Sequence, residues 1–166
     1  MCIRDSSIAD VYVKTTADSM GLGGDDTDVA TMEVIARISS GSLNVQEGDI
    51  SYYVSCKVTY SDGSATFATV DSGTADSLEL DGTDITAGTE ITAGTTFKFE
   101  IDLGATNVDA TDTTIDADDF GTATVPGCDA EAGAGEELEL RVVVSGGGET
   151  LANLKIESIT LGKSMM

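Results

Sequence analysis

Histidine and tryptophan are absent from this chain of 166 residues, and proline occurs once. Without histidine the chain cannot form a Ser-His-Asp or Cys-His catalytic arrangement, nor a zinc site that uses imidazole ligands. Basic residues are also scarce, with 8 Lys and Arg against 30 Asp and Glu, which gives a formal net charge of −22. A chain of this charge repels phosphate groups, so we expect neither nucleic acid nor an anionic lipid surface as a partner.

The acidic residues do not make the chain a disordered tail, because 40% of it is hydrophobic and apolar residues recur in ordered alternation. The length fits one domain with enough chain to bury a core. Self-repulsion between the acidic groups is screened over roughly 10 Å at 0.1 M salt. We therefore expect a saline setting, marine or halophilic.

The first six residues, MCIRDS, need separate treatment. They back-translate to a sequence that is similar to a transposon adapter used to prepare sequencing libraries. We therefore interpret residues 1–6 as an artefact of sequence assembly, set Cys2 aside, and expect the native chain to begin upstream.

Residues 7–24 connect this start to the remainder of the chain. Within them Ile8, Val11 and Tyr12 have helical spacing and precede a glycine-rich break. The pattern predicts the end of an N-terminal helix followed by a linker, with one folded domain at 25–166.

Side-chain alternation predicts about eight β-strands in that domain. The clearest runs from 49 to 60, where one face carries only apolar or aromatic residues and the inward-facing Cys56. The other expected strands are 29–38, 65–70, 77–80, 96–103, 122–125, 137–145 and 149–161. No helical pattern after residue 20 supplies the crossovers of a parallel sheet, so the fold class is all-β, an antiparallel sandwich.

Cys56 and Cys128 form an even pair once Cys2 is set aside. In an oxidising compartment they would suit a disulfide, which stabilises by roughly 4 kcal/mol in the chain-entropy model. The alternative is two buried free thiols. A disulfide requires the two Cα atoms to lie within roughly 7 Å of each other.

Two groups of aspartates offer the oxygen ligands that calcium takes. They are Asp25, Asp26 and Asp28, and then Asp109, Asp112, Asp116, Asp118 and Asp119. Neither group has EF-hand spacing, since a loop that starts at Asp109 has Thr114 and Phe120 where a glycine and an acid are required. Calcium is the one cofactor that the sequence leaves open, and a solvated acidic surface is the simpler interpretation.

Other catalytic patterns are equally unspecific. Carboxylate pairs are so frequent in this chain that they do not indicate glycosidase chemistry, which needs a defined separation across a cleft. The glycine-rich segments at 21–24 and 146–148 lack the Lys-Ser/Thr that phosphate-binding loops require. We therefore expect that the protein is not an enzyme.

Three segments share a pattern of turn and strand. They are SLNV at 42–45, AGTTFKFEIDL at 93–103, and GAGEELELRVVVSGGGET at 133–150. In order and spacing they resemble archaellins, the type IV pilin-like subunits of archaeal swimming filaments, and the likeness spans roughly residues 29–161. The resemblance implies an outer immunoglobulin-like sandwich and a long hydrophobic N-terminal helix, of which 7–24 would be the remnant in a truncated chain.

The resemblance also implies what the protein does. We expect an extracellular structural subunit whose partners are copies of itself in a helical filament, with membrane contact only before assembly, through the missing helix. Tyr53 and Ile35 are candidate residues for contacts between copies. The alternative is another secreted or cell-surface sandwich, such as an adhesion pilin, an S-layer module or a carbohydrate-binding domain.

Overall fold

The computed structural model describes residues 6–17, 28–60, 62–103, 127–128 and 132–166. These residues form nine β-strands and no helix. The strands are β1 (Ser6–Ala17), β2 (Asp28–Ile38), β3 (Val45–Gln46), β4 (Ile50–Thr59), β5 (Thr66–Thr74), β6 (Glu90–Ile91), β7 (Thr96–Asp102), β8 (Glu137–Val144) and β9 (Glu149–Lys155). No described segment is a helix of the length and apolarity needed to cross a membrane.

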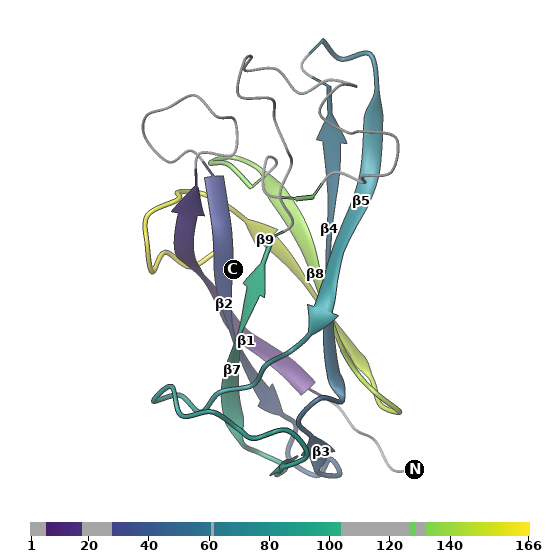
Figure 1. Cartoon of the computed structure of the whole chain (residues 1–166), viewed down its shortest axis with the longest axis vertical. Coiled ribbons are helices and arrows are strands. Elements are labelled where there is room, and N and C mark those ends of the chain that lie inside the picture. Colours follow the sequence, from purple (N-terminus) through teal and green to yellow (C-terminus); the bar gives the residue numbers. More distant parts are fainter. Residues whose placement is uncertain (1–5, 18–27, 61, 104–126, 129–131) are drawn as a thin grey trace.

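The strands form two main antiparallel sheets (Figure 1). One has three strands in the order β1-β2-β7, and the other has four in the order β5-β4-β8-β9. A small third sheet pairs β3 with β6. The two main sheets lie face to face, so the predicted all-β antiparallel sandwich is confirmed.

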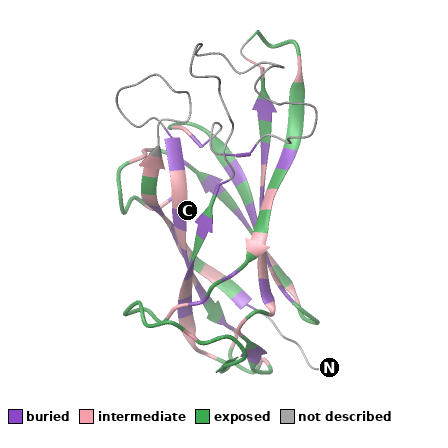
Figure 2. Cartoon of the chain, viewed as in Figure 1, coloured by how far each residue is buried: buried purple, intermediate pink, exposed green. Residues whose placement is uncertain are grey.

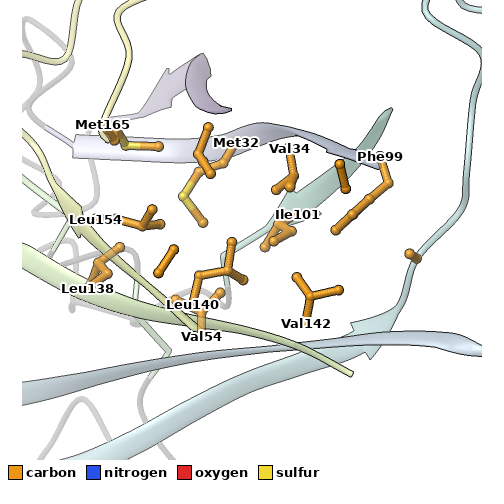
Figure 3. Close-up of a cluster of buried hydrophobic side chains, with 14 of the residues drawn as sticks. Met32, Val34, Val54, Phe99, Ile101, Leu138, Leu140, Val142, Leu154 and Met165 are labelled. Carbon is orange, nitrogen blue, oxygen red and sulfur yellow. The ribbon is translucent and has the colours of Figure 1, made fainter. Parts of the chain in front are cut away.

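The core lies between the two main sheets because apolar residues alternate with polar ones along each strand. Figure 3 shows side chains of β2 and β7 pointing toward side chains of β4, β8 and β9. Phe97, Phe99 and Ile101 of β7 are fully buried, as are Leu140 and Val142 of β8. Each such side chain contributes about 1.5–3 kcal/mol by leaving water.

Tyr52 joins the two sheets from the inward side of β4. Its ring stacks on that of Phe99, with centroids 6.1 Å apart. A Cβ atom at position 73 would lie only 2.6 Å from the Tyr52 hydroxyl oxygen, so Gly73 leaves room for the ring. Burial raises the pKa of Tyr52, and the carboxylates of Asp102 and Asp71 raise it further.

The prediction that residues 7–24 begin with the end of a helix is wrong, because the strand β1 occupies residues 6–17. Val11 and Val13 are 0% and 1% exposed and pair with Val34 and Met32 of β2. This is the two-residue period of a strand, and Val and Thr also favour extended backbone. Tyr12, which gave the helical spacing, is only half-buried and lies on the other side of the strand.

The C-terminal segment returns to β1 instead of continuing β9. The strand predicted at 149–161 ends at Lys155, and the chain then runs along the second edge of β1. The amide of Met165 donates to the carbonyl of Val11, and that of Val13 to the carbonyl of Lys163. Met165 is 2% exposed, so its side chain completes the core at this edge.

Three further strand predictions differ from the structure. The segment predicted as a strand at 77–80 forms only isolated bridges, from Leu78 to Asp84 and Lys98. The short strands β3 and β6 were not predicted, since two residues carry no detectable alternation. The strand predicted at 122–125 lies outside the described residues.

Candidate functional site

The calcium prediction falls almost entirely outside the described residues. Of its candidate ligands only Asp28 is described; it is 5% exposed at the start of β2, in register with Ala17. The others are Asp25, Asp26, Asp109, Asp112, Asp116, Asp118 and Asp119. Within the described ranges no group of three or more Cys, Asp or Glu side chains could hold a metal ion, and calcium binding stays a prediction.

Cys56 and Cys128 are joined by a disulfide, with Cα atoms 5.9 Å apart. Cys56 reaches it from the inward face of β4, and Cys128 is fully buried. The amide of Cys128 also donates a 2.9 Å hydrogen bond to Asp71 of β5. The disulfide therefore ties Cys128 to β4 across a sequence separation of 72 residues, and the hydrogen bond ties it to β5.

One surface hollow of about 620 Å³ lies beside the point where the β4–β8 ladder ends. Its lining includes Lys57 and the acidic residues Glu136, Glu137 and Glu139. These glutamates are exposed to solvent, whereas glycosidases hold two carboxyl groups at a defined separation across a cleft. The hollow gives no support for a glycosidase.

The net charge is distributed very unevenly between the sheets and the rest of the chain. The outer face of the four-stranded sheet carries three basic and three acidic residues, a net charge of zero: Lys57, Arg141 and Lys155 against Glu137, Glu139 and Glu149. The outer face of the three-stranded sheet carries Lys14, Arg37 and Lys98 against Asp10, Glu33, Glu100 and Asp102, a net charge of −1. Subtracting these from −22 leaves −21 for the remainder of the chain.

Ion pairs cover the outer face of the three-stranded sheet. The ammonium groups of Lys14 and Lys98 lie 3.6 and 3.3 Å from Glu33, and Lys14 also contacts Glu100. The hydrogen bond to Glu100 raises the pKa of Lys14. Ile35, a predicted contact residue, is only half-buried here and lies opposite Lys98.

The outer face of the four-stranded sheet instead exposes apolar side chains. Tyr53 of β4, Val70 of β5 and Leu151 of β9 are 41%, 53% and 54% exposed. Arg141 of β8 lies opposite both Tyr53 and Leu151. We call the outer face of the four-stranded sheet, which carries Tyr53, Val70, Arg141 and Leu151, the Tyr53 face.

Sequence reasoning found only part of the Tyr53 face. Tyr53 was predicted as a contact residue, and that role stays a prediction. Val70 and Leu151 were missed, although each is an apolar residue at an outward position of its strand. Each lies one residue out of step with the inward-facing positions of its strand, and this alternation was the feature of the sequence that could have identified both as outward-facing.

Comparisons with known proteins add little to this description. No family model and no curated protein sequence matches the chain. Among solved structures, a chain of the archaeal flagellum of Methanospirillum hungatei strain JF1 aligns with 98% of this chain and 71% of its own length, with a TM-score of 0.43 and 11% sequence identity. Similarity at this level establishes neither family nor function.

Proposed function

We propose that the chain is the outer, solvent-facing sandwich of an archaellin-like subunit of an archaeal swimming filament, with a structural and not a catalytic role. The observation that carries the proposal is where the three archaellin-like segments lie in the fold. Residues 42–45 lead through β3 toward β4, residues 93–103 contain β7, and residues 133–150 contain the turn before β8 and the start of β9.

These segments build both sheets of the sandwich. The middle one supplies Phe97, Phe99 and Ile101 to the core from the three-stranded sheet. The last one supplies Leu138 and Leu140 from the four-stranded sheet. The likeness therefore concerns the elements that define the sandwich and not one local turn, although sandwiches of this kind serve many functions.

Two physical features support an extracellular location. A structural disulfide such as Cys56–Cys128 persists in oxidising compartments. The charge of −21 outside the two sheet faces keeps assemblies soluble and apart by mutual repulsion, which salt moderates. In the proposed filament the partners are copies of the same subunit, held together by N-terminal helices.

The proposal places the filament-forming helix upstream of β1. Residues 7–17 belong to the sandwich, so the helix cannot include them. The complete reading frame should then encode a short basic leader followed by about 20 apolar residues, enough for one hydrophobic helix. Recovery of the upstream sequence is the measurement.

A second measurement reads the assembly itself. Antibodies raised against this chain and applied to cells carrying the complete gene should label surface filaments along their length in electron microscopy. Antibody pre-absorbed with the chain is the control. A cleavable secretory signal upstream, with label spread over the cell surface, would contradict the proposal and favour another kind of surface module.

A further inference from the structure

We propose that the Tyr53 face is a docking surface for a second copy of this chain. The inference rests on the proposed function only in that a filament brings copies together, and it can be tested without a filament. Four observations support it: the geometry of the face, its exposure, its charge, and its contrast with the other sheet.

The strand register places the residues of the face side by side. Tyr53 of β4 lies directly opposite Arg141 of β8, which lies opposite Leu151 of β9. Val70 of β5 lies opposite Ser55, on the next outward row. Tyrosine and arginine are among the residues enriched at the energetic centres of protein interfaces, and here they are adjacent on the two central strands of the sheet.

Exposed apolar side chains are concentrated on this face. Eight large hydrophobic side chains are exposed in the part of the chain that the structure describes, and Tyr53, Val70 and Leu151 are three of them. Figure 2 shows exposed positions alternating with buried ones along the strands. Rigid strands hold these side chains in place, so docking costs little ordering entropy.

Charge indicates which partner fits. A strongly basic partner would be drawn to the acidic remainder of the molecule and not to a face of zero net charge. A second copy is repelled by that remainder, so it can approach closely only where the net charge is near zero, which holds for the two outer sheet faces. The Tyr53 face combines neutrality with apolar surface, which is the complement that another acidic molecule of this kind requires.

The other outer face is a poorer docking surface. Lys14, Lys98, Glu33 and Glu100 would lose water on docking while already paired with one another. Desolvation of such pairs offsets much of what a contact gains. The Tyr53 face also has ion pairs, since Arg141 lies 3.9 and 3.6 Å from Glu139 and Glu149. It differs in that three large apolar side chains are exposed beside them, and these lose water favourably on docking.

Sedimentation equilibrium of the 166-residue chain in low and high sodium chloride tests the proposal. We expect the average mass to rise with protein concentration in high salt, where the repulsion is screened. Leu151→Asp should weaken the association at least about tenfold, because it removes apolar surface from the contact and adds a carboxylate that must lose water there. Leu80→Asp is the matched control, since Leu80 is 55% exposed but lies on a connection, and it should leave the dissociation constant within about twofold.

Circular dichroism melts establish that each variant is folded, and Leu151→Ser replaces Leu151→Asp if the latter is not. A chain that stays monomeric at millimolar concentration in high salt overturns the proposal. Equal weakening by Leu151→Asp and Leu80→Asp also overturns it, because the association would then be unspecific. A secretory signal upstream with association intact would remove the proposed function and leave the docking surface standing.

Discussion

The two sheets of the sandwich bury similar side chains but differ on their outer faces. The outer face of the three-stranded sheet is covered by the ion pairs of Lys14, Glu33, Lys98 and Glu100. The Tyr53 face leaves three large apolar side chains in water. Both faces come from strands with the same alternation, so exposed apolar surface does not follow from a sandwich fold as such. The proposed docking of a second copy on the Tyr53 face accounts for this difference.

The largest expected effect is on the free energy of unfolding, when an inward-facing side chain and an outward-facing one are each replaced by alanine. Phe99→Ala should lower the free energy of unfolding by about 3–5 kcal/mol, because it opens a cavity beside Phe97 and Tyr52. Leu151→Ala should change it by about 0.5 kcal/mol or less in the monomer. Urea unfolding measures both at low salt. Comparable losses for the two variants would mean that Leu151 is packed within the monomer and is not a free residue of the outer face.

The next effect concerns the disulfide, which joins β4 of the four-stranded sheet to Cys128 on the connection between β7 and β8. The double variant Cys56→Ala, Cys128→Ala should be less stable by about 2–4 kcal/mol, since a long loop is no longer closed in the unfolded chain. Urea unfolding again provides the measurement. As a control, reducing agent should lower the midpoint of the native chain and leave that of the double variant unchanged. Equal midpoints for the native chain and the variant would show that the bond contributes nothing.

The sequence predicted those strands whose alternation is unbroken. Residues 49–60 and 96–103 have apolar side chains at every second position, and they became β4 and β7 with the expected inward faces. β1 was mistaken for a helix because its register against β2 shifts between Ile8 and Asp10 and again between Val13 and Thr15. Each shift interrupts the two-residue period from which a strand is recognised.

The Tyr53 face was harder to predict than the strands that form it. Its central row joins Arg141 and Leu151, from the consecutive strands β8 and β9, to Tyr53 of β4, which is far from both in the sequence. Alternation shows that each side chain points outward, but it does not show that β8 lies between β4 and β9. The pairing of β4 with β8 is long-range, and no local pattern in the chain specifies it.

The smallest expected effect lies at the edge of the three-stranded sheet, where the C-terminal segment meets β1. Burial raises the pKa of Asp10, but hydrogen bonds from Ser164, Tyr12 and Val11 outweigh it, so the pKa lies below its usual value. Because the pKa of Asp10 is lower in the folded state than in the unfolded state, its carboxylate stabilises the protein when the pH is above the unfolded-state pKa. This contribution is lost as the pH falls through the folded-state pKa. Ser164→Ala should therefore cost about 1 kcal/mol or less at pH 7, and the cost should shrink below about pH 4. Urea unfolding at several pH values measures this cost. Ser158→Ala, which removes a hydroxyl hydrogen-bonded to Thr160, is the control and should show no such pH dependence. If the cost of Ser164→Ala is constant with pH, the Asp10 carboxylate is not its origin.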